Sequence, residues 1–339
     1  MKMIKTEDAV GRVLQHDVTR IVPGEFKGRL FKKGHVIREE DIEPLLKAGK
    51  FHVYVWEDTP GLVHENDAAQ ILIDATCSEA EGLEFAEVKE GKIDIFAARD
   101  GLLKVDKEQL LNLNMIDEIM FATLHNNMEV KKGEKIGGTR VIPLMIREEL
   151  LEQAKKTCNK SLISVKEIKK KKVGIVTTGS EVFTGKIKDK FGPVIRDKVE
   201  YFGCEVLGQS IIDDKKEKIS EAILEWFEKG AELVVCTGGM SVDPDDMTPT
   251  AIKDCGGELV TYGSPVLPGA MLLLSYLNEK PILGLPACVM YSKRTVFDLV
   301  LPRVLADEKL TKRDIAELGH GGLCMDCPVC TYPHCSFGK

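Results

Sequence analysis

Three aspartates and two glycines follow an apolar run in the segment CTGGMSVDPDDMTPT, residues 236–250. Glycine has no Cβ, so Gly238 and Gly239 would let backbone N–H groups approach a phosphate closely. Asp245 and Asp246 would repel a bare phosphate, whereas a Mg²⁺ ion takes oxygen ligands from carboxylate and phosphate together. The segment therefore predicts an anion site with a divalent cation. The alternative is a tight turn with a capped helix and solvated aspartates.

A helix start follows these aspartates. Thr248 and Pro249 are typical of an N-cap residue and the first residue of a helix. The free amides and positive dipole end of that helix would face an anion bound beside the glycines. Ser180 and Ser241 are candidate donors to phosphate or carbonyl oxygens, and a role as turn serines is an open alternative for both.

Three further polar loops follow apolar runs in the same part of the chain, and one more segment precedes the last strand. They are TTGSE (177–181), IIDD (211–214), GLPAC (284–288) and SPVLPGAM (264–271). Glu181 is an acidic candidate because a surface glutamate at a strand end has little structural use. Asp213 and Asp214 are candidates too, although either could be an N-cap. None of the seven histidines falls in these loops, so no Ser/His/Asp triad is expected.

Strands and helices alternate regularly from Lys172 onward. The apolar runs VGIVTTG, CEVLGQSII, ELVVCTGG, GELVTYG and PILGLP predict strands. Helices are expected at residues 194–202, at 216–229, from Pro249, and from Tyr291 to about Leu305. This alternation is typical of an α/β fold with a doubly wound, mostly parallel sheet, in which ligands lie beyond the carboxyl ends of the strands. The polar loops should therefore meet at one edge of the sheet.

Three other regions complete the chain. Residues 1–58 predict a small β-rich module with a helix at 39–47 and a strand in FHVYVW. Residues 59–165 predict an α+β domain of unknown role that begins at TPG. Its expected helices and strands are 66–75, 106–113, 146–157, IDIFA, EIMFATL and GTRVIPLMI. The α/β domain covers residues 172–310, and residues 319–339 form a cysteine-rich tail.

Composition and charge exclude several function classes. The chain has 339 residues, a formal charge of −7 and no long basic block, so no nucleic-acid partner is expected. The N-terminus MKMIKTEDAVGRVL lacks an apolar signal core, and the longest apolar stretch, residues 270–277, is too short to span a bilayer. We therefore expect a cytoplasmic protein with no membrane partner. Six of the ten cysteines are scattered singly and are interpreted mostly as small core residues.

The ordered motifs TTGSE, IIDD, TGGMSVDPDDMT, PVLPG and GLP resemble those of the molybdopterin-binding domain. That domain is shared by molybdopterin molybdenumtransferases, molybdopterin adenylyltransferases and the competence-damage-inducible protein A family. The resemblance covers about residues 172–305, and five motifs agree in order. Near the N-terminus, DAVGRVL and GHVIREEDIEPLLKAGKFHVYV are similar to the edge module of the molybdenumtransferases.

The resemblance implies a three-layer α/β/α domain that binds molybdopterin or its adenylylated form, with Mg²⁺ near the pyrophosphate. In the molybdenumtransferases, adenylyl-molybdopterin is hydrolysed as molybdate is inserted into the dithiolene. The resemblance therefore implies a transferase of molybdenum or tungsten cofactor biosynthesis, acting with molybdate or tungstate, and self-association into a homo-oligomer. The implied acidic, catalytic residues are Glu181, Asp213, Asp214 and Asp246. The implied cofactor-binding residues are Thr178, Gly179, Ser180, Gly238, Gly239, Ser241, Asp245, Thr248, Pro268, Gly269, Gly284 and Pro286.

The sequence also departs from the family pattern. Asp243 and Pro244 stand where GGVSxGxxD would have a glycine and its successor, and PGAM lacks the lysine of PGKP. Ala287 and Cys288 replace the GN of GLPGN, and Phe191 stands in place of an asparagine. These changes favour two alternatives to the transferase. One is a non-catalytic molybdopterin carrier or sensor, and the other, suggested by DPDDMT, is a nucleotide pyrophosphatase.

The last four cysteines crowd the tail GHGGLCMDCPVCTYPHCSFGK, residues 319–339, as Cys324-x2-Cys327-x2-Cys330-x4-Cys335. This run approaches the C-x2-C-x2-C-x3-C of ferredoxins but misses the last spacing by one residue. We predict an iron–sulfur cluster on these thiolates. A Zn²⁺ site, in which His320 or His334 could replace one thiolate, and a metal-free thiol tail are the alternatives. A metal centre would suit redox, metal-delivery or docking functions, with a molybdoenzyme or redox protein as partner.

Overall fold

The computed structural model describes residues 2–22, 26–55 and 60–339. The chain divides into two compact units, one made of residues 1–98, 105–124 and 132–164 and the other of 99–104, 125–131 and 165–339. The boundary expected at residues 58 and 59 lies outside the described residues. The four-part domain division given above stays a prediction. No helix within the described ranges is long and apolar enough to cross a membrane.

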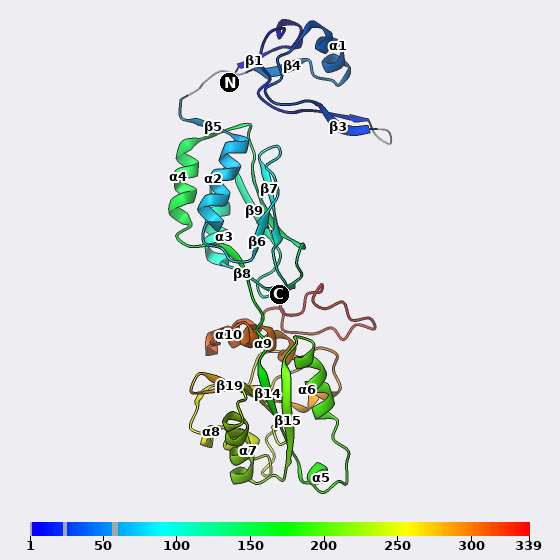
Figure 1. Ribbon diagram of the computed structural model, residues 1–339, viewed down its shortest axis with the longest axis vertical. Helices are drawn as coiled ribbons and strands as arrows, with labels where there is room; N and C mark the ends of the chain where they lie inside the picture. Colours follow the sequence, from blue (N-terminus) through cyan, green and yellow to red (C-terminus); the bar gives the residue numbers. More distant parts are fainter. Residues whose placement is uncertain (1, 23–25, 56–59) are drawn as a thin grey trace. The chain divides into compact units, whose positions relative to one another are not determined.

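A six-stranded sheet forms the centre of the second unit, in the order β15–β14–β16–β19–β18–β17. Figure 1 labels β14, β15 and β19 of this sheet. Its strands are β14 (Lys172–Thr178), β15 (Glu205–Ile212), β16 (Leu233–Thr237), β17 (Glu258–Tyr262), β18 (Leu273–Leu277) and β19 (Lys280–Leu285). The first four strands in the sheet order are parallel, whereas β18 runs antiparallel to both of its neighbours. The carboxyl ends of β15, β14, β16 and β19 therefore lie at one edge.

Helices cover both faces of this sheet. They are α5 (Ser180–Phe183), α6 (Phe191–Glu200), α7 (Lys216–Glu228), α8 (Thr248–Asp254), α9 (Val296–Leu305) and α10 (Lys312–Glu317), with the 3-10 turn η2 (Ala287–Met290). Apolar residues of α6 and α9 join one buried cluster, and those of α7 and α8 join a second. The α/β class and the three-layer arrangement predicted from the sequence are confirmed.

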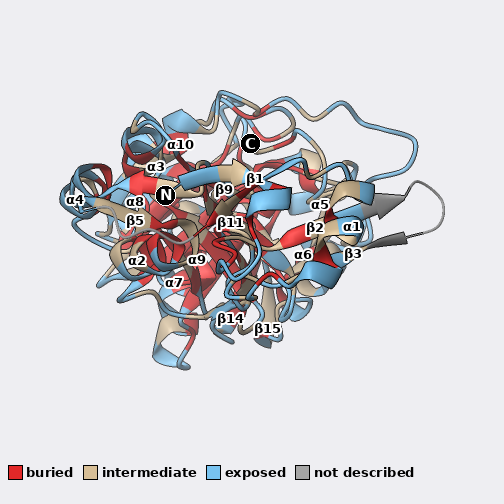
Figure 2. Cartoon of the chain, turned by 90° about the horizontal axis from the view of Figure 1, so that it is seen from above, coloured by how far each residue is buried: buried red, intermediate tan, exposed pale blue. Residues whose placement is uncertain are grey.

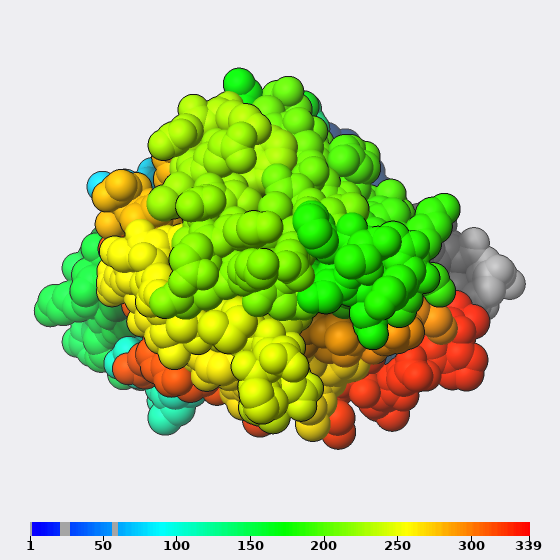
Figure 3. Space-filling view, turned by 90° about the horizontal axis from the view of Figure 1, so that it is seen from below, coloured from blue at the N-terminus to red at the C-terminus, as the bar shows by residue number. Residues whose placement is uncertain are grey.

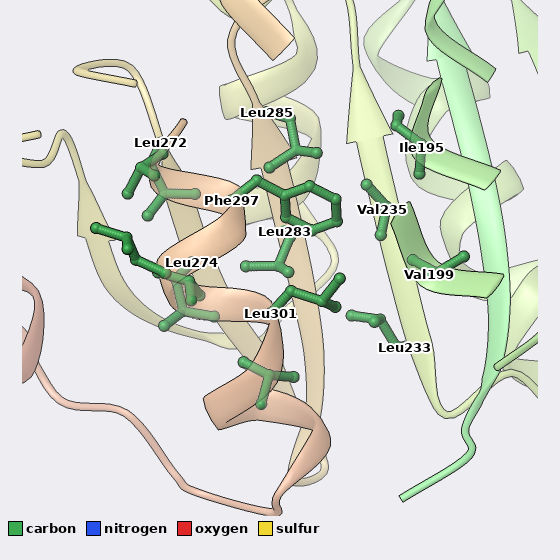
Figure 4. Close-up of a cluster of buried hydrophobic side chains, with 14 of the residues drawn as sticks. Ile195, Val199, Leu233, Val235, Leu272, Leu274, Leu283, Leu285, Phe297 and Leu301 are labelled. Carbon is green, nitrogen blue, oxygen red and sulfur yellow. The ribbon is translucent and has the colours of Figure 1, made fainter. Parts of the chain in front are cut away.

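The two clusters lie on opposite faces because side chains alternate along each strand. Leu233 and Val235 of β16 belong to the first cluster, together with Phe297 of α9 (Figure 4). Val234 and Cys236 of the same strand belong to the second. A strand buried on both faces reads as a continuous apolar run, which is why ELVVC predicts a central strand. Every residue of α9 is buried, and Figure 2 shows this concentration of buried positions in red.

Trp226 fixes α7 against the sheet. A Cβ at Gly174 of β14 would lie 2.6 Å from Cγ of Trp226, and a Cβ at Gly208 of β15 would lie 2.5 Å from its Cη2. The indole therefore needs glycine on both strands. This close packing sets the position of the residues at the start of α7, which line the pocket described below.

The strand order creates a switch point beside β14. The chain passes from β14 to β15 on one side and then to β16 on the other side of β14. The loops that leave β14 and β16 therefore run to opposite faces of the sheet, and a crevice forms between them at the carboxyl edge.

The first unit contains smaller sheets. Its N-terminal part comprises β1 (Lys2–Lys5), the 3-10 turn η1 (Thr6–Asp8), β2 (Val18–Val22), β3 (Phe26–Phe31), α1 (Glu39–Lys47) and β4 (His52–Val55). Strand β1 pairs with β4 and β2 pairs with β3, both antiparallel. The β-rich character predicted for this module is confirmed.

The middle of the chain is α+β, as predicted. Its helices are α2 (Glu65–Cys77), α3 (Lys107–Asn114) and α4 (Glu148–Thr157). Its strands are β5 (Leu62–His64), β6 (Leu83–Phe85), β7 (Lys92–Ala97), β8 (Gly101–Val105), β9 (Ile119–Thr123), β10 (Glu129–Val130), β11 (Lys135–Val141), β12 (Met145–Arg147) and β13 (Ile163–Lys166). Four of them form a sheet in the order β6–β7–β11–β9.

Three expectations about elements were wrong. The segment GTRVIPLMI contains two strands, β11 and β12, which Pro143 separates. The apolar stretch at 270–277 contains strand β18, which was not predicted. The last helix of the α/β domain begins at Val296 rather than Tyr291, because Thr295 and Asp298 form a capping box there.

Candidate functional site

Loops at the carboxyl edge of the large sheet line one pocket with a cavity of about 1270 Å³. Figure 3 looks onto this edge, where green residues near 180, yellow residues near 245 and orange residues near 287 surround a hollow. The lining residues are Thr178, Gly179, Ser180, Glu181, Val182, Phe191, Asp213, Asp214, Lys215, Lys216, Glu217, Gly238, Gly239, Met240, Ser241, Asp243, Pro244, Asp245, Asp246, Met247, Met271, Pro286 and Ala287. Loops after β14, β15, β16 and β19 all contribute.

Ser180 links the first two of these loops. Its hydroxyl donates to Oδ1 of Asp213 at 2.8 Å and to Oδ2 of Asp214 at 3.1 Å. Its backbone N–H also donates to Oδ2 of Asp214 at 2.7 Å. The hydrogen bond from the Ser180 side chain, with smaller contributions from nearby lysines, lowers the pKa of Asp213. The two aspartates thus fix the loop after β14 and present acceptor oxygens at the rim.

The glycine pair after β16 lies against the end of β14. Gly238 has φ of +85°, and a Cβ there would lie 2.0 Å from the carbonyl oxygen of Thr178. Gly239 has φ of +53°, and its Cβ would lie 3.1 Å from the hydroxyls of Thr178 and Thr248. Only glycine fits at Gly238, since any side chain would meet backbone. Glycine would let the backbone approach a phosphate closely. The packing of this turn against the end of β14 requires glycine as well.

Thr248 does not cap helix α8 as the sequence predicted. The N-cap position belongs to Met247, and no side chain caps the helix. The Thr248 hydroxyl donates to the carbonyl oxygen of Gly238 at 2.8 Å and lies 3.0 Å from the Thr178 hydroxyl. The hydroxyl of Thr248 therefore bonds to the Gly238 carbonyl instead of capping the helix, and it stabilises the glycine turn. Thr248 is fully buried.

The aspartates of DPDD form a turn at the mouth of the pocket. The N–H of Asp243 donates to Oδ2 of Asp246 at 3.3 Å, and the N–H of Asp246 donates to the carbonyl of Asp243 at 3.0 Å. Tyr262 supports the preceding residues by donating to the carbonyl oxygen of Met240 at 2.8 Å. Burial, followed by the charge of Asp246, raises the pKa of Tyr262, which keeps its hydroxyl a donor.

The pocket is strongly acidic. Among its lining residues are seven carboxylates and only two ammonium groups, a formal excess of five negative charges. Both lysines face carboxylates: Lys215 lies 3.7 Å from Asp213, and Lys216 lies 2.8 Å from Asp254. An anionic ligand would therefore need a cation to offset this charge.

Most of the predicted site residues meet in this pocket. All four acidic candidates line it. Pro286 lines it too, as do the seven predicted cofactor-binding residues that precede α8 in the chain. Pro268, Gly269 and Gly284 do not line it, and Thr248 lies behind Gly238 and Gly239. Their assignment as binding residues stays a prediction.

Two of the glycines outside the lining have a packing function. A Cβ at Gly269 would lie 2.4 Å from Cγ1 of Val296, and a Cβ at Gly284 would lie 2.6 Å from Cε of Met240. Gly269 thus lets its loop pack on the start of α9, and Gly284 lets Met240 fill the space over β19. Close packing is therefore sufficient to explain why glycine occupies both positions.

Sequence reasoning missed several lining residues. Val182, Met240, Met247 and Met271 give the pocket apolar surface, and Lys215, Lys216 and Glu217 supply charges from the start of α7. The lysines could have been found, since they directly follow IIDD. Met271 is the last residue of SPVLPGAM, a segment that the sequence did single out, but an apolar side chain there carries no signal of its own for binding.

The four tail cysteines lie elsewhere, around a small second cavity of about 50 Å³. Cys327 and Cys330 are exposed, whereas Cys324 and Cys335 are half-buried and pack against the first buried cluster. A hydrogen bond from the backbone of Tyr332, together with Arg294, lowers the pKa of Cys330. As the described side chains stand, no three of His, Cys, Asp and Glu form a group that could hold a metal ion.

Two parts of the chain match known protein families. Residues 174–306 match the family described as "Probable molybdopterin binding domain". The resemblance predicted for this part of the sequence is confirmed. Residues 3–57 match a second family, described as "Domain of unknown function (DUF8806)". The predicted likeness of this part to the molybdenumtransferase edge module stays a prediction.

Similar proteins include a CinA-like protein of Mycobacterium tuberculosis (strain ATCC 25177 / H37Ra), which is 38% identical over 90 residues. That alignment covers 26% of this chain and 21% of the relative, so the chain matches about a fifth of the length of that protein.

Two solved structures are also similar. One is CinA, "with unknown function", from Thermoplasma acidophilum, with 20% identity, a TM-score of 0.32, and 34% of this chain and 88% of that chain covered. The other is the molybdopterin biosynthesis enzyme MoaB from Thermus thermophilus, with 20% identity, a TM-score of 0.33, and 41% and 98% covered.

Proposed function

We propose that the acidic pocket binds molybdopterin or adenylyl-molybdopterin together with Mg²⁺, and that the protein takes part in molybdenum or tungsten cofactor biosynthesis. The observation that carries this proposal is the meeting of four loops in one pocket within the part of the chain that matches the molybdopterin-binding family. A pterin with a phosphate needs both apolar surface and polar groups. Met240, Met271 and Phe191 offer the first, and the backbone near Gly238 and Gly239 the second.

Magnesium suits the charges of this pocket. In proteins Mg²⁺ is commonly held by one or two carboxylates plus substrate phosphate oxygens and water, without a full set of protein ligands. Such a site does not need three metal-binding side chains close together, and no such group is found among the residues that the structure describes. Bound Mg²⁺ would supply charge neutralisation at the phosphate oxygens. We assign its carboxylate ligands to Asp246 and Glu181, since Asp213 and Asp214 accept short hydrogen bonds from Ser180, whereas the hydrogen bond that Asp246 accepts from the Asp243 N–H is longer, at 3.3 Å.

The reaction we propose is that of a molybdopterin molybdenumtransferase. Water cleaves the phosphoanhydride of adenylyl-molybdopterin and AMP leaves. The two dithiolene sulfurs then bind the metal of molybdate or tungstate, and one oxygen of the oxyanion leaves as water with the two thiol protons. In this reaction Asp246 orients the attacking water, and Ser180 holds the rim loop in place. The proposed partners are accordingly adenylyl-molybdopterin and an oxyanion of molybdenum or tungsten, with a molybdoenzyme as recipient.

AMP release tests this function. The full-length protein, purified anaerobically, is incubated with adenylyl-molybdopterin, Mg²⁺ and molybdate. We expect AMP release that falls by about 100-fold or more in Asp246→Asn, because a group that positions or activates water contributes about 10²–10⁴ in rate. Asp197→Asn on α6, outside this pocket, is the matched control and should leave the rate unchanged.

Two other outcomes would replace the transferase. Tight retention of the ligand with no AMP release, in wild type as in Asp246→Asn, indicates a carrier or sensor. Hydrolysis of ADP-ribose with no affinity for the pterin indicates a nucleotide pyrophosphatase, the alternative that the DPDD turn and the likeness to CinA-like proteins favour.

A further inference from the structure

The cysteine tail is held to the α/β domain at several points, although neither matched family extends to it. Leu323 forms a parallel β-bridge with Leu267, and the N–H of Cys324 donates to the Leu267 carbonyl at 2.8 Å. At the other end, Phe337 is buried in the first hydrophobic cluster. Segment 324–335, which we call the thiol loop, is therefore a closed loop fixed at both ends.

All four cysteines of the thiol loop line the same cavity. Cys324 and Cys335 lie at the anchored ends and are half-buried, while Cys327 and Cys330 lie in the exposed part between them. The ends are thus fixed by the domain, and the middle pair is exposed to solvent, with Cys330 hydrogen-bonded to the Tyr332 backbone and to Arg294. Each of these cysteines is a free thiol.

Two cations of the α/β domain lie against this loop. Nζ of Lys293 donates to the carbonyl oxygens of Cys327 at 3.1 Å and of Pro328 at 2.9 Å. The guanidinium of Arg294 lies 4.7 Å from the ring centre of Tyr332 and pairs with Asp298 at 2.9 Å. Both Lys293 and Arg294 line the cavity with the four thiols.

We propose that the thiol loop binds one thiophilic metal centre, Zn²⁺ or a [4Fe–4S] cluster, through Cys324, Cys327, Cys330 and Cys335. Four thiolates around either centre leave a net charge of about −2, which Lys293 and Arg294 are placed to offset. Binding requires Cys327 and Cys330 to turn inward from their exposed positions toward the two anchored thiols. This inference is independent of the function proposed for the acidic pocket.

Neither form of binding changes the number of electrons. Zn²⁺ replaces the protons of four thiols, which are released to solvent. A preformed cluster carrying small thiolate ligands exchanges those ligands for the four cysteines, and each leaving thiolate takes up one cysteine proton.

The test uses the full-length protein, reduced and kept anaerobic. One sample is titrated with Co²⁺, a coloured probe for the zinc site, and another with a synthetic [4Fe–4S] cluster bearing small thiolate ligands. We expect one centre per chain from one of the two probes, with thiolate-to-metal absorption. The probe that binds tells the two centres apart.

Variants show whether the thiol loop is the site. Cys327→Ser and Cys330→Ser should each weaken binding by about 10-fold or more, and Lys293→Gln by about 10-fold, as for groups next to metal ligands. Cys255→Ser, on a half-buried cysteine after α8, and Lys229→Gln, on an exposed lysine, should bind as wild type does. Circular dichroism checks that each variant is folded.

Three results would overturn the proposal. The first is that the folded, reduced protein takes up neither probe. The second is that Cys327→Ser and Cys330→Ser bind the probe as tightly as wild type does. The third is that mass spectrometry finds the four tail thiols paired in disulfides in the protein as isolated and, once reduced, they acquire no metal.

Discussion

The backbone N–H of Ser180 donates to Oδ2 of Asp214 at 2.7 Å, although the two residues leave different strands of the sheet. This bond joins the loop after β14 to the loop after β15 at the rim of the acidic pocket. Asp214 therefore acts on the pocket through Ser180, as a positioning residue. Among the four acidic candidates, Asp213 and Asp214 thus support the loop after β14, and Asp246 supports the DPDD turn.

Replacing Asp214 separates positioning from charge. Asp214→Ala removes acceptors for the N–H and hydroxyl of Ser180, so we expect about 1–2 kcal/mol lower unfolding free energy and weaker pterin binding. Asp214→Asn keeps one acceptor oxygen and should recover part of both losses. Urea unfolding and ligand titration measure the two effects. Equal losses in Ala and Asn would show that the charge of Asp214, rather than its hydrogen bonds, matters.

Gly238→Ala should be strongly destabilising. Its φ is +85° and the new Cβ would lie 2.0 Å from the carbonyl oxygen of Thr178, so we expect a loss of about 2–4 kcal/mol. Gly185 has φ of +74° and nothing near a Cβ, so Gly185→Ala should cost only about 1–2 kcal/mol. Urea unfolding followed by the fluorescence of buried Trp226 gives the comparison. Similar losses in the two variants would contradict the packing of the glycine turn on β14.

Removing divalent cations should weaken ligand binding. The pocket carries an excess of five formal negative charges, so an anionic ligand bound without Mg²⁺ would meet repulsion. We expect EDTA to weaken binding by about 10-fold or more, which corresponds to about 1.4 kcal/mol. Added Mg²⁺ should restore the affinity, and the same concentration of Na⁺ should not. Binding unaffected by EDTA would exclude the cation from the site.

Acid should destabilise the protein partly through Asp314. Burial raises the pKa of Asp314, but hydrogen bonds from Thr311 and the ion pair with Arg303 at 2.6 Å outweigh it and lower the pKa to about 2. A depressed carboxyl pKa gives stability above the ordinary value of 3.8 that is lost as pH falls toward about 2.

Asp314→Asn should therefore be less stable than wild type near neutral pH and should show a smaller further loss between about pH 4 and pH 2. Glu317→Gln, on the exposed side of the same helix, is the control, since an exposed pair with Arg313 contributes little. Denaturant midpoints across this pH range measure both. Parallel curves for Asp314→Asn and wild type would contradict the predicted linkage.

The centre of the large sheet could be predicted from the sequence because β14, β16 and β19 are buried on both faces. Short apolar runs that end at glycine, such as VGIVTTG and ELVVCTGG, are typical of buried strands, and the polar loops at their ends lie at one edge whenever the strands are parallel. The convergence of Glu181 and Asp246 on one pocket followed from that rule.

Other features depend on tertiary contacts that the sequence does not display. Thr248 has the sequence pattern of an N-cap, but the Gly238 carbonyl takes its hydroxyl. Strand β18 was missed because an apolar run without polar alternation does not distinguish strand from buried helix. Gly269 and Gly284 resemble phosphate-binding glycines, and only the positions of Val296 and Met240 reveal their packing.

Direct titration of the full-length protein with molybdopterin, under anaerobic conditions and with Mg²⁺, tests the central claim. We expect one equivalent per chain, and at least a 10-fold loss of affinity, about 1.4 kcal/mol, in Ala287→Trp, which places an indole in the lining of the pocket. Ala316→Trp, exposed on α10 away from the pocket, should bind as wild type does. No binding by wild type, or equal binding by Ala287→Trp, would contradict the account.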